Sequence, residues 1–399
     1  MTDLLGSARA RSRSRSPPPA ADAPILLLGE RPGEPLQLAT LRALHCYDPE
    51  RPLRRFAPAR GETLPCGALC DWRVPDEQVR SDEHFRWQDK AAAQDVLATL
   101  NATPRDARCV FVEATHSYYV DGQLVPWSGT TFSHYCELHF DADEVLRRTR
   151  PGWARRKGLL RPDGEEMDAE EIKAFWAANG ESQSRRGTLM HWQIECYLNG
   201  YDIGAPQSPE FGLFLQFERH FLDALGLTPW RTEMNLFHCG LRLAGQADLV
   251  CLDQGGRYVI LDWKRSREIK EVHFEGKRQR PPLDHLPSSN RHCYNLQLNT
   301  YRHILESEYG LEVSAMYLVV LHPEQRPRVP HVYKVPLLRD EIEALVRQVA
   351  ADKGVSTKSL PGADSPFDLR GLRFGAPAGA PAAAAPEVAA AAAAAAAAR

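Results

Sequence analysis

The sequence lacks any apolar run approaching the roughly 18–20 residues that a helix needs to cross a bilayer, so we expect no membrane protein. It shows no secretory signal peptide and no paired cysteine spacing. Its nine cysteines are an odd number, and the close pair Cys66 and Cys70 has no second pair to complete a zinc site. These absences predict reduced thiols in an intracellular protein.

The chain also has little net charge, −3, which excludes a bulk polycation that binds nucleic acid by charge alone. An apolar content of 43% and a charged content of 25% are typical of a globular protein. The cations gather in two clusters, one from Arg147 to Arg161 and one from Lys264 to Arg280. Such clusters can contact phosphates without reading sequence, although each could also be a solvated loop.

Composition divides the chain into four parts. Residues 1–24 form an Arg- and Ser-rich arm that cannot bury a core and is expected to be disordered. This arm fits an organellar transit peptide or a nuclear arm, so mitochondrion and nucleus both stay open. Residues 25–108 form an accessory region of unknown role, residues 109–352 the main domain, and residues 353–399 a low-complexity Ala/Pro/Gly tail.

Apolar periodicity predicts an alternation of helices and strands in the main domain. Helices are expected there at Asp141–Arg148, Ala169–Asn179, Gly187–Leu198, Glu210–Leu225, Arg291–Glu308 and Arg339–Ala350. One more helix is expected in the accessory region, at Asp89–Leu100. Strands are expected at Cys109–Glu113, Thr232–Phe237, Arg242–Leu252, Arg257–Trp263, Val313–Leu321 and His331–Val335. This order predicts an α/β (α+β) fold with a mixed central β-sheet flanked by helices.

Two of these strands carry charges where burial alone would not place them. One contains Asp248 between apolar neighbours, and the other ends in Asp262-Trp263-Lys264. Two carboxylates on neighbouring strands can hold Mg²⁺ (or Mn²⁺), and the bound ion activates water for attack on a phosphodiester. Lys264 shares a strand face with Asp262 and could stabilise the scissile phosphate. The alternative is a buried Asp–Lys ion pair.

Two helices supply further polar pairs at helical spacing. His191 and Glu195 are four residues apart on one helix face, and Gln297 and Tyr301 are related in the same way on another helix. Each pair alone could be an ordinary surface pair.

The order G-T-x-x-H, G-x-x-D, D-W-K and Q-x-x-x-Y resembles the PD-(D/E)XK nuclease superfamily, in its RecB-like branch with the mitochondrial genome maintenance exonucleases. The resemblance spans about residues 110–338 and includes the Thr115–Gly122 hairpin and the segment Trp127–Thr131. It implies that residues 109–352 are a nuclease domain with a restriction-endonuclease-like core and a helical insertion.

The resemblance also implies a role for each matching residue. His191, Asp248 and Asp262 match metal ligands, with the Trp263 carbonyl as a further one, and Lys264 matches the catalytic lysine. The candidates for substrate binding are Ser128, Thr130, Arg265, Gln297 and Tyr301, and Glu195 and Glu233 are further candidate site residues. Gly129 stands where relatives often have Val. Some RecB-like nucleases hold an iron–sulfur cluster on later cysteines, but none follows Cys293 here, so no cluster is expected.

The function predicted on this basis is that of a metal-dependent DNA nuclease, a single-strand-preferring exonuclease in DNA maintenance, repair or recombination. Trp153, Phe175 and Trp176 lie among arginines in the insertion, and Trp192 follows His191. Arginines and aromatics together can line a channel for unpaired bases, although these aromatics could instead be helix core. The alternatives are a sequence-independent endonuclease, a catalytically weak nucleic-acid-binding protein on the same fold, and a scaffold. DNA against RNA preference and protein partners stay open.

Overall fold

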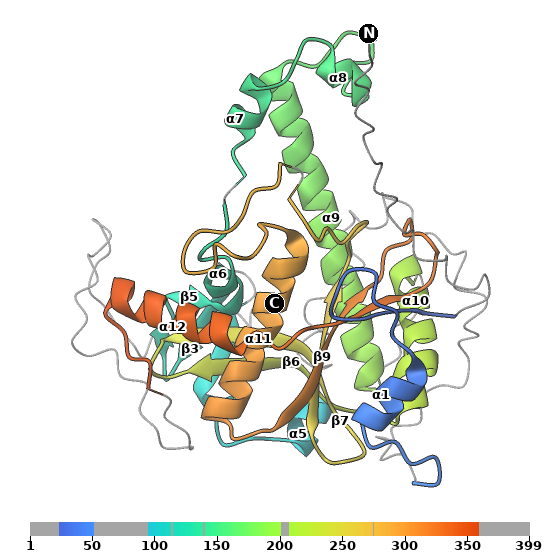
Figure 1. Cartoon of the computed structure of the whole chain (residues 1–399), viewed down its shortest axis with the longest axis vertical. Coiled ribbons are helices and arrows are strands. Elements are labelled where there is room, and N and C mark those ends of the chain that lie inside the picture. The colour runs from blue at the N-terminus through green and yellow to red at the C-terminus, as the bar shows by residue number, and fades with distance from the viewer. Residues whose placement is uncertain are drawn as a thin grey trace, which may run out of the picture.

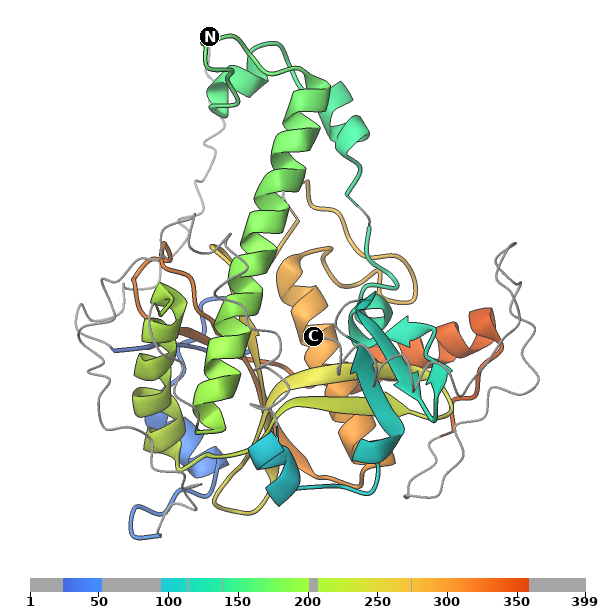
Figure 2. The ribbon, with the colours of Figure 1, turned by 180° about the vertical axis from the view of Figure 1, so that it is seen from behind.

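The computed structural model describes residues 24–51, 95–112, 115–138, 140–200, 207–273 and 275–358. A twisted sheet lies at the centre with helices on both faces, and a long helix projects away from it (Figures 1 and 2). The Arg/Ser-rich arm up to residue 23 and the tail beyond residue 358 lie outside the described residues, as do residues 89–94 of one expected helix.

The central sheet is mixed, as the sequence predicts. Its strand order is β1-β10-β9-β8-β7-β5, and β6 pairs with β7 on the other side. The pairs β1/β10, β8/β9 and β5/β7 are parallel and the others antiparallel. The strands are β1 Leu26–Leu28, β5 Trp127–Ser128, β6 Thr228–His238, β7 Leu243–Leu252, β8 Tyr258–Lys264, β9 Val313–Val320 and β10 His331–Lys334.

A second, three-stranded sheet contains the predicted hairpin. Its strands are β2 Cys109–Val112, β3 Ser117–Val120 and β4 Gln123–Leu124, in the order β2-β3-β4. The turn at Asp121 and Gly122 has positive φ at both residues, which is the geometry of a tight hairpin turn.

Helices cover the two faces of the central sheet and form two hydrophobic cores. One core lies under α1 Leu38–Leu44, α9 Ala169–Leu198 and α10 Pro209–Phe217, which continues through Glu218–Leu222 and Asp223–Leu225. The other lies under α6 Gly129–Ser133, α11 Asn290–Glu308 and α12 Arg339–Lys353. On β8 the Trp263 ring enters the first core between Phe214 and Phe217, while Ile260 enters the second. Alternation along β8 therefore directs Asp262 toward the α11 face.

The predicted helices Ala169–Asn179 and Gly187–Leu198 are in fact one 30-residue helix, α9, so the predicted start at Gly187 is wrong. The helix starts at Ala169, as predicted for the first of the two segments, and the side chain of its N-cap Asp168 forms a capping box with Glu171. Gly187 lies inside the helix, where a glycine costs only about 1 kcal/mol relative to alanine and does not end it. At about 1.5 Å per residue, α9 carries its first residues far from the sheet.

The short helices α7 Ala142–Arg147 and α8 Trp153–Arg156 lie at the far end of α9 (Figure 1). They pack there around Ala154, Leu159 and Ile172. The insertion that the sequence predicts is therefore a small helical cap on a long helical arm.

The described parts of residues 25–108 join the same sheet and core. Strand β1 extends the sheet beside β10, and Leu41 of α1 is fully buried. The short helix α5 Asp95–Leu100 buries Leu97, and the Arg105 guanidinium lies 2.9 Å from the buried Glu308 carboxylate of α11. These segments therefore help to complete the core, and the division of residues 25–108 from the main domain as an accessory region stays a prediction.

Candidate active site

The site forms where β7 and β8 separate. Their antiparallel pairing ends at Leu249 opposite Leu261, so Asp248 and Asp262 are the first residues beyond the fork. Strand β8 continues along β9, with Asp262 beside Leu318. The freed Trp263 backbone N–H donates to Asp248 Oδ2 at 2.7 Å. The Asp248 carboxylate thus replaces the backbone acceptor that β7 no longer supplies. The fork between the two strands also lets side chains from both faces of the sheet meet.

Asp262 and Lys264 lie on one face of β8, as their spacing predicts, and they form an ion pair. Lys264 Nζ lies 2.5 Å from Asp262 Oδ2, and the Asp262 side chain is only 2% exposed. Burial raises the pKa of Asp262 to about 6, although the ammonium of Lys264 opposes this shift. Burial opposes the charge on Lys264, but the carboxylates of Asp262 and Asp248 outweigh it and raise the lysine pKa. Lys264 is therefore a charged ammonium at neutral pH.

His191 reaches the fork from α9 and meets two carboxylates. Its Nδ1 lies 3.3 Å from Glu233 Oε1 on β6 and 3.7 Å from Asp248 Oδ2. One ligand atom from each of these three residues lies within 4.8 Å of the others. Burial lowers the pKa of His191, but the two carboxylates outweigh burial and raise the pKa to about 9.

Glu233 enters this group through an unusual backbone conformation. Its φ of +44° lies in the left-handed region that non-glycine residues seldom occupy. The register, with Thr232 opposite Leu249 and Met234 opposite Ala247, places Glu233 directly across from Asp248. Such strain costs roughly 1–3 kcal/mol and is concentrated at functional sites. From the sequence, Glu233 is only a further candidate, because a strand carboxylate that faces solvent is the commoner case. No local pattern in the sequence reports a positive φ.

The donor set fits a hard divalent cation. Glu233 and Asp248 offer carboxylate oxygens and His191 a ring nitrogen, a mixture that suits Mg²⁺ or Mn²⁺. The nearby Asp262 Oδ1 is buried and has no hydrogen-bond partner among the described residues. A cation would satisfy that oxygen. Glu195 is buried one turn after His191 and is outside the group of three. The Trp263 side chain is in the core, so only its carbonyl could serve as a ligand.

Tyr301 and Gln297 of α11 lie beside the fork. Gln297 Nε2 donates to the Tyr301 hydroxyl at 2.9 Å and to Thr130 Oγ1 at 3.4 Å. Burial raises the pKa of Tyr301, and the charges of Asp262 and Asp248 add to the shift. The Q-x-x-x-Y motif and the Ser128–Thr131 segment, which from the sequence are separate candidates for substrate binding, are therefore joined by a hydrogen bond.

Two glycines make room for the Tyr301 ring. A Cβ at Gly129 would lie 2.5 Å from Tyr301 Cε1, and a Cβ at Gly245 would lie 2.6 Å from the same atom. This close approach explains why both positions hold glycine. Ser128 is the N-cap of α6, and its hydroxyl accepts from Thr131 N at 3.0 Å.

Arg265 is not part of this group. Its Nε lies 2.6 Å from Glu210 Oε1 of α10, and both side chains are 4% exposed. The guanidinium also contacts Gln183 of α9. Arg265 therefore ties the end of β8 to two helices.

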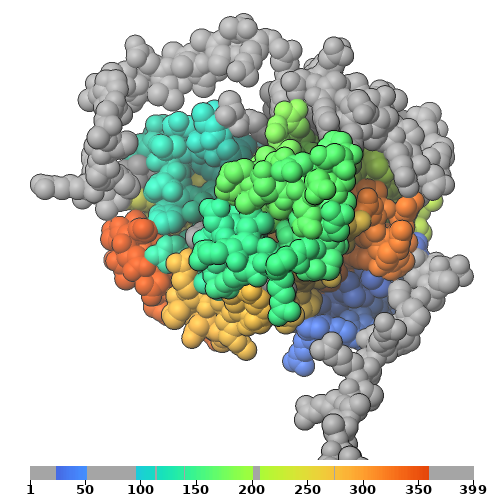
Figure 3. All heavy atoms as spheres, turned by 90° about the horizontal axis from the view of Figure 1, so that it is seen from above, coloured from blue at the N-terminus to red at the C-terminus, as the bar shows by residue number. Residues whose placement is uncertain are grey.

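A cavity of about 1030 Å³ lies between the helical cap and the loop that follows β8. In the view from above, the atoms of the cap lie beside those of this loop (Figure 3). Its walls carry six Lys or Arg and five Asp or Glu side chains, so the lining is nearly neutral. Trp153 contacts the Trp176 ring edge-to-face at 6.3 Å, and both belong to the small core of the cap. Phe140 is 70% exposed and Phe175 47% exposed.

Comparison with protein families matched residues 153–368, more than half of the chain, to the PD-(D/E)XK nuclease superfamily. The chain belongs to the PD-(D/E)XK nuclease superfamily. Nucleases of this superfamily hydrolyse phosphodiester bonds in nucleic acids and generally use a divalent metal. The mixed sheet with flanking helices is consistent with the restriction-endonuclease-like fold of these nucleases, as the sequence predicts.

The other comparisons add little detail. A solved structure titled "Crystal structure of SSO0001" is similar at 15% identity with a TM-score of 0.24, over 54% of this chain and 84% of that one. A search of the curated proteins found no match. In the part of this PD-(D/E)XK chain that the structure describes, no helix is long and apolar enough to cross a membrane.

Proposed function

We propose that this protein is a metal-dependent deoxyribonuclease of the RecB-like branch that degrades single-stranded DNA from a free end. It would serve DNA maintenance, repair or recombination in the mitochondrion or the nucleus. The observation that carries the proposal is the convergence of His191, Glu233 and Asp248 at the β7/β8 fork, beside the Asp262–Lys264 pair.

Each residue of the fork has a distinct task in this proposal. Asp248, Glu233 and neutral His191, with Asp262 and the Trp263 carbonyl, would hold Mg²⁺ or Mn²⁺. When bound, the cation makes water a better nucleophile and neutralises charge that develops on the phosphate. Lys264 is held by Asp262 and offers its ammonium protons to the attacking water or to the scissile phosphate. His191 must release its proton before its nitrogen can bind the cation.

The cavity beside the helical cap supports a single-stranded substrate. Unpaired bases can stack on exposed aromatic rings, and Phe140 is an exposed ring on the cavity wall. Arg150 and Lys270 also line the cavity and make no ion pair with any described residue, so both can contact phosphates. Because the lining is nearly neutral, base stacking should contribute more to DNA binding here than net charge does. Trp153 and Trp176 support the cap itself.

The catalytic part of the proposal is tested with Asp262→Asn in a nuclease assay with Mg²⁺. We expect cleavage to be lost while DNA binding persists, because the change removes a ligand charge and keeps the shape of the side chain. Asp340→Asn, at an exposed position on α12, makes the same chemical change and should keep full activity. Wild-type turnover by Asp262→Asn would contradict the proposed metal site.

The substrate part is tested with one single strand in linear and circular form. We expect rapid degradation of the linear DNA and little attack on the circle, since a circle has no end to enter the cavity. Equal rates would show a sequence-independent endonuclease instead. A matched RNA strand tests the DNA preference, and binding without cleavage under every metal condition would indicate a catalytically weak binding protein.

A further inference from the structure

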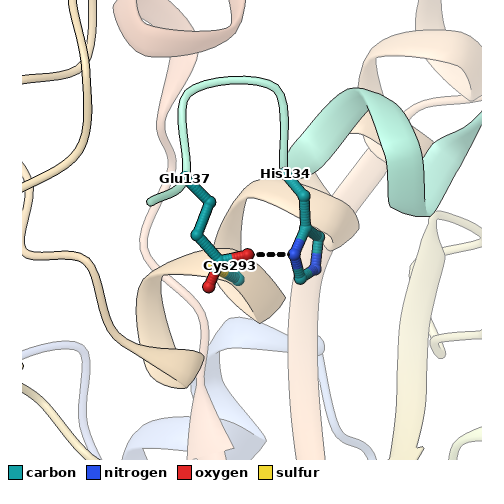
Figure 4. A group of neighbouring side chains, drawn as sticks. All are labelled: His134, Glu137 and Cys293. Carbon is teal, nitrogen blue, oxygen red and sulfur yellow. Dashed lines mark hydrogen bonds and ion pairs between the residues drawn. The ribbon is translucent and has the colours of Figure 1, made fainter. Parts of the chain in front are cut away.

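A second group of candidate metal ligands lies outside the active site. It consists of His134, Glu137 and Cys293, and one ligand atom of each lies within 4.8 Å of the others. Figure 4 shows the three side chains converging, with an interaction between His134 Nδ1 and the Glu137 carboxylate. Cys293 is only 1% exposed and lies in the first turn of α11.

These donors differ in kind from those of the fork. The fork offers mainly carboxylate oxygen, whereas this group combines a thiol sulfur, an imidazole nitrogen and one carboxylate oxygen. Sulfur and imidazole favour Zn²⁺ and similar borderline metals over Mg²⁺. Three protein ligands would leave a fourth tetrahedral position for water. The two groups should therefore select different cations.

The backbone already holds two of the ligands in place. Glu137 N donates to the His134 carbonyl at 3.0 Å, which closes a tight turn directly after α6. Arg280 fastens the same turn from another loop, because its backbone N–H donates to the Cys136 carbonyl at 2.7 Å and its guanidinium to the Glu137 carbonyl at 2.8 Å. The ligands need little rearrangement to bind, so little of the binding free energy is lost in ordering them.

We propose that His134, Glu137 and Cys293 form a zinc-class metal site that joins the turn after α6 to the start of α11. On binding, the Cys293 thiol gives its proton to solvent and the thiolate becomes a ligand. This site is separate from the fork, and metal binding there does not require nuclease activity.

A metal ion bound at this site would restrict the motion of the cavity wall and of α11. Glu137 lines the 1030 Å³ cavity and directly precedes the insertion, while His134 lines a second cavity of about 620 Å³. Tyr294, next to Cys293, has its ring 5.2 Å from Lys264 Nζ. A metal here would therefore fix both the cavity wall and the helix that carries Gln297 and Tyr301.

The test uses Co²⁺ as a spectroscopic probe on the full chain, with excess Mg²⁺ present to occupy the fork. We expect one equivalent of Co²⁺ to give a thiolate-to-cobalt charge-transfer band that Zn²⁺ abolishes by displacement. The band should be lost in Cys293→Ser and weakened in His134→Ala. It should persist in Asp262→Asn, which alters only the fork, and in Cys136→Ser, which removes a neighbouring buried thiol that is not among the ligands.

A second measurement distinguishes loss of metal binding from poor folding of a variant. Zn²⁺ should raise the thermal melting temperature of the wild type and of Cys136→Ser but not that of Glu137→Gln, whose side chain is only half-buried. Absence of a thiolate band in the wild type, or its survival in Cys293→Ser, would overturn the proposal and leave a hydrogen-bonded cluster without metal.

Discussion

Replacement of Gly245 by Ala should displace the Tyr301 ring and weaken both stability and cleavage. The new Cβ would lie 2.6 Å from Tyr301 Cε1, whereas non-bonded carbons prefer about 3.5–4.0 Å. The ring is 3% exposed, and Gly129 of α6 approaches the same edge. It therefore cannot swing into solvent to relieve the contact.

The sign of the stability change is the informative quantity. An ordinary Gly→Ala change inside a strand or helix gains roughly 0.5–1 kcal/mol by reducing backbone freedom. Overpacking in a core costs about 1–3 kcal/mol, so we expect Gly245→Ala to lose roughly 1–2 kcal/mol net. A ring that shifts must also stretch the 2.9 Å bond from Gln297 Nε2 to its hydroxyl, so cleavage should fall as well.

Urea unfolding and a nuclease assay with Mg²⁺ measure the two effects. Gly187→Ala is the matched control, because a Cβ at that position of α9 meets no atom within 4 Å and should raise stability. In a double-mutant cycle, Tyr301→Ala should cost less in the Gly245→Ala background than in the wild type. The reasoning fails if Gly245→Ala is as stable and active as the wild type.

Three further changes test other parts of the structure. Lys264→Ala should reduce turnover by the equivalent of about 2–4 kcal/mol. It should also move the pH–rate profile to higher pH, because the ammonium of Lys264 lowers the pKa of Asp262. Lys264→Arg should not restore activity, and a fully active Arg variant would count against this geometry. Burial lowers the pKa of His238 to about 3, and the charges of His303 and Arg105 add to this shift. The Nδ1 atom of His238 accepts a hydrogen bond from Leu241 N at 3.2 Å and also lies near the Glu308 carboxylate. Below about pH 6.5 the His238 ring is therefore protonated in the unfolded chain but not in the folded one, so the free energy of unfolding should fall by about 2 kcal/mol at pH 5. The urea midpoint of His238→Gln should depend less on pH than that of the wild type. Arg105→Ala removes the guanidinium from the buried Glu308 and should destabilise the fold by roughly 3–5 kcal/mol; a change below 1 kcal/mol in urea unfolding would show that the contact is dispensable.

The sequence by itself predicted most strands and helices of the main domain and the residue types of the candidate site. Apolar runs with sharp ends predict β7 and β8, and the Asp-x-Lys spacing predicts the Asp262–Lys264 pair, because side chains two apart on a strand share a face. His191 was predicted as a ligand only through resemblance, and the structure brings it to Asp248. These patterns lie within short stretches of sequence, so they can be recognised without knowledge of the fold.

Only the tertiary structure decided how distant segments meet. The entry of β1 into the sheet and the burial of Arg265 against Glu210 depend on partners far away in the chain. Glu233 has its left-handed backbone at a position across from Asp248, and the need for glycine at position 129 arises from Tyr301, 172 residues later. Local periodicity reports which face of an element is apolar, but it carries no information about which side chain fills the space opposite.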